Sequence, residues 1–325
     1  MRIENRAFLF PGQGAQTLGM AADLVEAYPA AKRVFADAEG LLGTDFLAVC
    51  RTGPEAELNS TRVSQPAIFL HSMAVLDVLA SQGLSSERFC VGLDAVGTAG
   101  LSLGEYSALV FAGSLTFEDA LRVVARRGEY MQEACDATQG AMASILALPA
   151  PEVEKVVEQA RAEGLQVGVA NYNSPGQTVI SGEKAAVEAT MEKLREAGAR
   201  RAVQLRVAGA YHSELMASAT TQLRPLLEEL KILPPRVPFY CNVTGKRATD
   251  PEEIRRGLIA QVESSVRWEQ SLVSLVDAGM QGAYELGPGR VLAGLMKSVA
   301  KGVSVVSLGT QEKLSELTEP ELRHE

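Results

Sequence analysis

The residues of this chain whose types and spacing could do chemistry centre on one serine. Ser102 stands between two glycines in the segment Gly100-Leu101-Ser102-Leu103-Gly104, after an apolar run and before a helix-like one. A Gly-x-Ser-x-Gly pattern between a strand and a helix is typical of a sharp turn that presents a serine hydroxyl as a nucleophile. The N–H groups that begin the following helix would face the negative charge that develops during acyl transfer. Alone the pattern is a weak signal, because a chain with 29 glycines can produce it by chance.

A serine nucleophile needs a base, and histidine is the usual choice because imidazole titrates near neutral pH. His71 lies in an apolar helical run over residues 68–79, which favours a packed histidine over a catalytic one. His324 is the penultimate residue of an acidic tail. His212 follows a predicted strand and precedes a predicted helix, the position at which α/β sheets build active sites. Elimination and placement both favour His212.

Buried strands and covering helices must position these side chains. Apolar runs predict strands over residues 7–10 and 95–99, the second of which leads into Ser102, and helices follow over 103–111 and 117–135. Further along the chain, strands over 239–243, 282–286 and 303–308 alternate with helices over 213–229 and 268–278. This alternation predicts an α/β fold with a mainly parallel sheet that is covered on both faces.

The pattern changes between residues 140 and 207. Strands are expected over 141–148, 166–171, 178–181 and 202–207, with helices over 151–162 and 183–197. The order β-α-β-β-α-β is that of a ferredoxin-like unit. We therefore expect a discontinuous large domain of residues 1–139 and 208–325, a small subdomain inserted over 140–207, and a charged, frayed tail over 311–325.

Composition excludes several classes of protein. The formal net charge of −9 argues against a nucleic-acid binder, which would carry a basic stripe. The cysteines, Cys50, Cys90, Cys135 and Cys241, are widely spaced, which predicts reduced, inert thiols in a cytoplasmic protein rather than a metal site or a disulfide framework. The N-terminus does not have the pattern of a signal peptide, and we expect no stretch to approach the roughly 20 apolar residues that span a bilayer.

A series of ordered motifs covers nearly the whole chain. They are Phe10-Pro11-Gly12-Gln13-Gly14-Ala15-Gln16, the segment from Gly100 to Leu109, Arg126-Arg127-Gly128-Glu129-Tyr130-Met131-Gln132, Gly140-Ala141-Met142-Ala143, Asn173-Ser174-Pro175-Gly176-Gln177, Ala210-Tyr211-His212, Asn242-Val243-Thr244-Gly245 and Glu285-Leu286-Gly287-Pro288-Gly289. Together they resemble the malonyl-CoA:acyl-carrier-protein transacylases of fatty-acid synthesis. The resemblance implies a hydrolase-like α/β core with an inserted ferredoxin-like subdomain.

The resemblance also implies roles for particular residues. Ser102 would be the nucleophile that takes the malonyl group from coenzyme A, and His212 its general base. The backbone N–H groups of Gln13 and Leu103 would form the oxyanion hole. Arg127 would pair with the free carboxylate of the malonyl group, since a planar guanidinium can hold a carboxylate through two parallel hydrogen bonds.

The resemblance implies roles for two further positions. The main chain of Gln261 would orient the histidine, so that a Ser–His pair suffices without an acid. Tyr211 resembles the bulky residue of malonyl-selective relatives, because its ring would crowd an α-methyl branch. Two departures stand out. Leu101 occupies the place where the family most often has histidine, and Ser265 replaces a common proline, which weakens the alignment of Gln261.

The resemblance implies no permanently bound cofactor, with malonyl-CoA and a phosphopantetheinylated acyl carrier protein as substrates. That carrier is acidic, so an acidic enzyme must offer it a local basic surface. The candidates are Arg200, Arg201, Arg206, Arg290 and Lys297. No nucleic-acid or membrane partner is expected, and the family suggests a monomer.

Other functions stay open at this point. A serine esterase or thioesterase could use the same turn, although such enzymes place an acid and then a histidine late in the chain, where only His324 is available. A catalytically silent acyl-binding or scaffold subunit is a second alternative. An acyltransferase that serves a polyketide pathway is a third, because the motifs do not distinguish the pathway.

Overall fold

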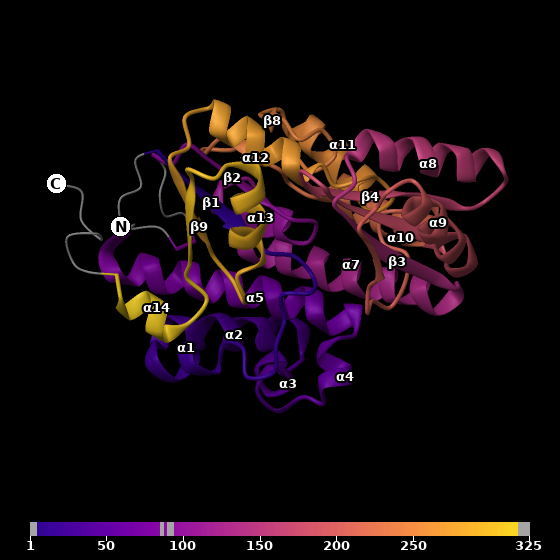
Figure 1. The fold of residues 1–325 in the computed structure, drawn as a ribbon. Helices are drawn as coiled ribbons and strands as arrows, with labels where there is room; N and C mark the ends of the chain where they lie inside the picture. Colours follow the sequence, from indigo (N-terminus) through magenta and orange to yellow (C-terminus); the bar gives the residue numbers. More distant parts are fainter. Residues whose placement is uncertain (1–4, 85–87, 90–93, 318–325) are drawn as a thin grey trace.

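The computed structural model describes residues 5–84, 88–89 and 94–317. Its helices and strands form two units side by side (Figure 1): a large one built on a six-stranded sheet and a smaller one built on a four-stranded sheet. The predicted fold class, a mainly parallel α/β core with a separate small β-sheet unit, is confirmed.

The large sheet carries the first predicted strand at its centre. Its order is β10 (Ser304–Ser307), β9 (Gly282–Glu285), β1 (Arg6–Phe10), β2 (Gly97–Gly100), β7 (Phe239–Tyr240) and β8 (Arg247–Ala248). All neighbours pair in parallel except β7 and β8. Residues 7–10 of β1 are completely buried because their side chains enter two different cores in alternation. The run is therefore continuously apolar, as expected for a parallel strand covered on both faces.

Helices cover both faces of this sheet. Phe8 and Phe10 pack in the core beneath α5 (Thr61–Leu79), α6 (Gly104–Phe111) and α7 (Phe117–Ala137). On the other face, Ala7 and Leu9 pack against α12 (Trp268–Asp277) and α13 (Val291–Val299). The remaining helices of this unit are α1 (Ala22–Ala27), α2 (Pro29–Leu42), α3 (Phe46–Thr52), α4 (Glu55–Leu58), η1 (Ala80–Leu84), η2 (Glu214–Met216), α10 (Ala217–Glu229), α11 (Pro251–Gln261) and α14 (Gln311–Ser315).

The smaller unit has the predicted element order. It consists of β3 (Gly140–Leu146), α8 (Ala150–Ala162), β4 (Val167–Ser174), β5 (Gln177–Glu183), α9 (Lys184–Glu196) and β6 (Arg201–Gln204). The sheet order β4-β5-β3-β6 is fully antiparallel, which is the arrangement of a ferredoxin-like unit. Val266, between α11 and α12, donates its N–H to Ala170 of β4 at 2.8 Å and so ties the two units together.

Five sequence predictions need correction. The helix α11 was not predicted, although Asp250 caps it and Pro251 opens it. The expected frayed tail begins with an ordered helix, α14, whose Leu314 is buried; residues 318–325 lie outside the described part of the chain. The strand expected over 202–207 ends at Gln204, and the one expected over 239–243 ends at Tyr240.

The fifth correction concerns membrane-spanning length. Thr61–Gly83, which joins α5 and η1, is 23 residues long and apolar enough to cross a bilayer, contrary to expectation. However, 94% of its most apolar window is buried inside the molecule, because α2, α6 and α7 pack around it. The all-round hydrophobicity of this helix is therefore that of a central core helix.

Candidate active site

Ser102 sits on a strained turn between β2 and α6. Its backbone φ is 51°, in the left-handed region that non-glycine residues rarely adopt. The flanking glycines are required by space: a Cβ on Gly100 would lie 1.8 Å from the Gly104 carbonyl oxygen, and one on Gly104 would lie 2.2 Å from the Phe10 carbonyl oxygen. The motif therefore describes a turn so tight that side chains on either side of the serine are excluded.

Asn242 holds this turn from the end of the neighbouring strand β7. Its Oδ1 accepts the Ser102 backbone N–H at 2.7 Å, and its Nδ2 donates to the Gly100 carbonyl at 2.7 Å. Its own backbone N–H donates to Glu105 Oε1 at 2.7 Å. Three hydrogen bonds from one buried residue thus connect the strand, the turn and the first turn of α6.

His212 lies opposite the serine, between β6 and η2. Its Nε2 is 2.9 Å from Ser102 Oγ, and its Nδ1 is 2.8 Å from the Gln261 carbonyl oxygen. The carbonyl can only accept, so Nδ1 carries the hydrogen and Nε2 is free to accept the serine proton. Burial and the nearby charge of Arg127 lower the pKa of His212 to about 4, so the ring is neutral at physiological pH.

The side chain of Gln261, the last residue of α11, connects the other groups of the site. Its Nε2 donates to the Ser102 carbonyl at 2.9 Å and also to Glu105 Oε2. Its Oε1 accepts from Arg127 Nη2 at 2.9 Å. The main chain of Gln261 therefore contacts His212. Its side-chain amide contacts Ser102, Glu105 and Arg127.

Arg127 reaches the site from the buried face of α7. The side chain is 1% exposed, and its Nη2 donates to Ser102 Oγ at 3.1 Å. Its Nη1 donates to Gln65 Oε1 of α5 at 2.6 Å. Burial lowers the pKa of Arg127, although a guanidinium is basic enough to remain charged. The structure thus brings together the three side chains that the sequence singled out: Ser102, His212 and Arg127.

These side chains open into a cavity of about 930 Å³ between the two units. Gln13, Leu103 and Tyr211 also line it, and among the described residues the backbone N–H groups of Gln13 and Leu103 have no hydrogen-bond acceptor. Tyr211 is held with its hydroxyl against Thr61 Oγ1 and 3.2 Å from Gln13 Nε2. The cavity therefore combines a hydroxyl, a neutral imidazole, a buried cation and two backbone N–H groups that have no acceptor among the described residues.

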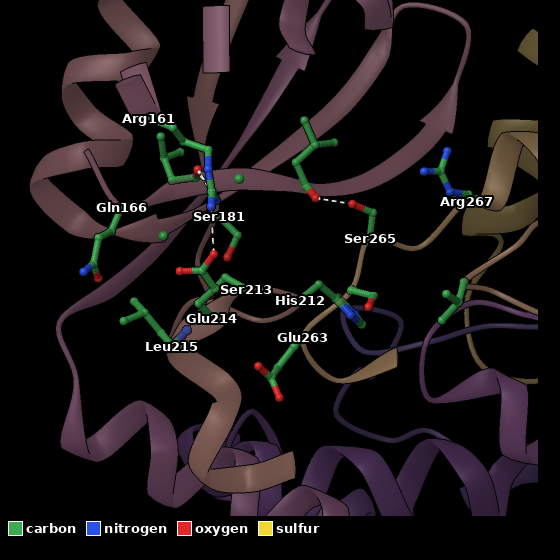
Figure 2. Close-up of a pocket in the computed structure, with 16 residues that line it drawn as sticks. Arg161, Gln166, Ser181, His212, Ser213, Glu214, Leu215, Glu263, Ser265 and Arg267 are labelled. Carbon is green, nitrogen blue, oxygen red and sulfur yellow. Dashed lines mark hydrogen bonds and ion pairs between the residues drawn. The ribbon is translucent and has the colours of Figure 1, made fainter. Parts of the chain in front are cut away.

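A second, smaller pocket of about 410 Å³ also has His212 in its lining (Figure 2). Its wall includes an ion pair of 2.8 Å between Arg161 of α8 and Glu214 of η2. Ser265 also lines it and donates its hydroxyl to the Val169 carbonyl of β4. The residue that replaces the common family proline therefore makes a bond between the two units, and Gln261 still reaches the site.

The other titratable candidates lie outside this site. His71 is buried in α5, with Nε2 2.8 Å from the Gly309 carbonyl oxygen, and burial lowers its pKa to about 4. Cys50, Cys135 and Cys241 are free and buried, and burial raises the pKa of each thiol to about 11 or 12. Cys90 and His324 lie outside the described residues. Within the described ranges, no group of three or more His, Cys, Asp or Glu side chains could hold a metal ion.

Sequence reasoning assigned no role to Gln65, Glu105 or Asn242. Glu105 and Asn242 lie in motifs that the sequence shares with the family, but those motifs do not predict which groups the two side chains contact. Gln65 had no signal, because a glutamine in an otherwise apolar helix resembles any buried polar residue.

Comparisons with known proteins decide the family. The acyl transferase domain family matches residues 7–319. The malonyl CoA-acyl carrier protein transacylase of Bacillus subtilis (strain 168) is 42% identical over 308 residues, covering 95% of this chain and 94% of that protein. The one from Escherichia coli (strain K12) is 41% identical over 302 residues, covering 93% and 95%. The chain belongs to the malonyl CoA-acyl carrier protein transacylase family. The predicted membership and the predicted acyltransferase class are confirmed.

Solved structures of this family share the fold. An acyl carrier protein S-malonyltransferase from Vibrio cholerae is 39% identical with a TM-score of 0.90, covering 97% of this chain and all of that one. A malonyl-transacylase solved with its type II PKS acyl-carrier protein is also 39% identical, with a TM-score of 0.89, and the match covers 95% of this chain and 97% of that one. Leu101 stands where the family most often has histidine. It donates its backbone N–H to the Phe10 carbonyl at 2.9 Å and lines the cavity.

Proposed function

We propose that this protein transfers a malonyl group from malonyl-CoA to the phosphopantetheine thiol of acyl carrier protein through an ester on Ser102. One observation carries the proposal: a single hydroxyl oxygen lies 2.9 Å from a neutral imidazole nitrogen and 3.1 Å from a buried guanidinium. A base for the serine and a cation for a substrate carboxylate thus meet at one atom. The names of the relatives support the same donor and acceptor.

In the first half-reaction His212 Nε2 takes the Ser102 proton while Oγ attacks the thioester carbonyl. The negative charge on the carbonyl oxygen faces the N–H groups of Leu103 and Gln13, and each such donor is typically worth about 2.7–4 kcal/mol. The C–S bond then breaks, and the coenzyme A thiolate leaves with the proton from His212. The product is a malonyl ester on Ser102.

In the second half-reaction the carrier thiol enters the same cavity after coenzyme A has left. His212 takes the thiol proton, the sulfur attacks the ester carbonyl, and Ser102 Oγ leaves with that proton. Division into two exchanges predicts ping-pong kinetics. The Gln261 carbonyl fixes the tautomer of His212 in both halves, so no acidic third member is needed.

Arg127 would hold the malonyl carboxylate. Its Nη2 would release Ser102 Oγ when the ester forms, because the alkoxy oxygen of an ester is a weaker hydrogen-bond acceptor than a hydroxyl. The donor that is freed faces the cavity and can bind a carboxylate oxygen. Charge-assisted pairs in a buried site are stronger than neutral hydrogen bonds, which explains a preference for an acyl group that carries a carboxylate.

The carrier protein would dock at the mouth of the cavity. Arg206 lines the cavity, and Arg290 precedes Val291, which lines it from α13; both arginines are exposed. Lys297, Arg200 and Arg201 are exposed as well. Reversing Arg206 and Arg290 to glutamate should raise the KM for the carrier and leave the KM for malonyl-CoA unchanged, whereas Lys32→Glu on α2 should change neither.

We also propose that residues 140–207 form a subdomain inserted into the large domain of residues 1–139 and 208–325, so that the cavity lies at their junction. A cytoplasmic location and a monomeric state stay predictions. The malonyl-transacylase of a type II PKS, similar in structure, favours a polyketide pathway as a second candidate. Presenting both kinds of carrier to the loaded enzyme and comparing discharge rates would separate the two pathways.

Intact-protein mass spectrometry after incubation with malonyl-CoA tests the central proposal. A transferase gains one malonyl group, loses it on addition of carrier protein, and gains none when Ser102 is replaced by alanine. An esterase or thioesterase would return the group to water without a carrier, and a silent subunit would never gain it. Either of those outcomes would remove the proposal.

A further inference from the structure

Among the described residues, Arg127 is a buried cation without a direct carboxylate partner. The hydrogen bonds of its guanidinium go to three neutral oxygens: Gln65 Oε1, Gln261 Oε1 and Ser102 Oγ. Within the described part of the chain, no ion pair reaches it. A buried charge is costly unless another charge compensates it. Something in the substrate-free site must therefore balance the guanidinium.

The carboxylate that acts on Arg127 is Glu105, in the first turn of α6. It is 1% exposed, and its oxygens accept the Asn242 backbone N–H and Gln261 Nε2. The other end of the Gln261 amide accepts from Arg127 Nη2 at 2.9 Å. A carboxylate, an amide and a guanidinium thus form one chain of charge-assisted hydrogen bonds.

Glu105 sets the direction in which the hydrogen bonds of this series run. An ionised carboxylate only accepts, so it requires the NH₂ end of Gln261 and turns the carbonyl end towards Arg127. The same NH₂ group donates to the Ser102 carbonyl at 2.9 Å, which agrees with that orientation. A glutamine at position 105 would have a single oxygen for two donors, so its NH₂ would face either the NH₂ of Gln261 or the backbone N–H of Asn242.

We propose that Glu105 is the internal counter-ion of Arg127, acting through the Gln261 amide, and that it takes up a proton when the substrate carboxylate binds Arg127. This inference rests on the proposed function, in which the malonyl carboxylate pairs with the guanidinium. Two carboxylates would then share one cation, and like charges in a dry site favour protonation of one of them. The net charge of the site stays near zero with and without the malonyl group.

The surroundings of Glu105 make this exchange possible near neutral pH. Burial raises the pKa of Glu105 to about 7, against the opposing hydrogen bonds of Asn242, Gln261 and Cys241 and the charge of Arg127. Of the titratable groups that face it, Cys241 has its pKa raised to about 12 by burial, and burial raises the pKa of Tyr106 still further. Neither of these changes charge between pH 6 and 8.5, and Arg127 remains charged.

Loading of Ser102 by malonyl-CoA and acetyl-CoA across pH 6 to 8.5 tests the proposal. Above its pKa in the free enzyme, Glu105 must bind a proton for malonyl to bind, so the apparent KM for malonyl-CoA should rise about tenfold by pH 8. The apparent KM for acetyl-CoA, which brings no carboxylate, should not rise. Glu105→Gln should abolish the rise, whereas Glu118→Gln, an exposed acid on α7, should keep it.

The outcomes separate this inference from the proposed function. If wild-type protein forms no malonyl ester, the proposed function fails; if it forms the ester without the pH-dependent rise, only the counter-ion proposal fails. A rise that persists in Glu105→Gln would overturn it as well. If that variant does not fold, proton uptake by wild-type protein in weak buffer with an indicator dye decides. Malonyl loading at pH 7.5 should take up more protons than acetyl loading, and equal uptake would overturn the proposal.

Discussion

Replacing Arg127 by alanine should change which acyl group the protein accepts. The guanidinium is 1% exposed, so a malonyl carboxylate bound to it would form a buried charge pair. Removing one partner of such a pair costs about 3–5 kcal/mol, which is a factor of roughly 150 to 5,000 in rate. Malonyl and acetyl loading lose the contact of Arg127 with Ser102 alike, so that loss cancels in their ratio.

The ratio of malonyl to acetyl loading, measured by intact mass under single-turnover conditions, should therefore fall by about two to four orders of magnitude. The ratio for Arg127→Lys should lie between those of the wild type and Arg127→Ala, because an ammonium keeps the charge but cannot form two parallel hydrogen bonds to a carboxylate. Arg126→Ala is the matched control, since Arg126 is exposed and pairs with Glu129 in the next turn of α7. Equal loss of both acyl donors in Arg127→Ala would refute the assignment of this residue to the carboxylate.

Three further predictions concern the same turn and cavity. Below its lowered pKa of about 4, the His212 ring is protonated and cannot accept the serine proton. At saturating malonyl-CoA, the loading rate should therefore stay level from pH 7 to 5 and fall only near pH 4. A fall centred at pH 6.5 would contradict this. Gly100→Ala should abolish folding or activity, because the added Cβ would lie 1.8 Å from the Gly104 carbonyl oxygen. The control is Gly294→Ala on α13, where the added Cβ meets nothing within 4 Å; this variant should raise stability by about 0.5–1 kcal/mol in thermal melts. Tyr211→Ala should increase loading from methylmalonyl-CoA relative to malonyl-CoA by about 10- to 200-fold, since a pocket discriminates one methyl group by about 1–3 kcal/mol. An unchanged ratio would show that the Tyr211 ring does not exclude a substituent on the α-carbon.

The sequence was sufficient for the parts of the fold that follow from local patterns. A continuous apolar run identified β1 because both faces of that strand are buried. The order of strands and helices identified the ferredoxin-like unit, whose sheet has the expected topology. Local patterns failed where the apolar signal was interrupted, as in α11, whose sequence contains four charged residues. They also failed at Leu314, whose burial depends on distant parts of the chain.

The site likewise contains residues that a local sequence pattern could identify and contacts that no local pattern could predict. Ser102 was identified by its flanking glycines, and His212 by elimination among three histidines, because these signals are local. The partners of Arg127 could not be predicted, since Gln65 and Gln261 lie 62 and 134 positions away in sequence. A hydrogen bond between helices that are remote in sequence has no periodicity, spacing or composition to mark it.

The two residues that we propose as nucleophile and base, Ser102 and His212, both have a left-handed backbone conformation. The sequence predicted a strained turn for Ser102 only. Ser102 and His212 have φ values of 51° and 57°, and a non-glycine residue in the left-handed region typically costs about 1–3 kcal/mol. Asn242 compensates at the serine, and at the histidine the Val262 carbonyl accepts its backbone N–H at 3.2 Å. Because each strained residue is held by a group outside its own segment, the hydroxyl and the imidazole meet before any substrate arrives. The two left-handed residues are thus the points from which the hydroxyl and the imidazole of two distant segments reach a separation of 2.9 Å.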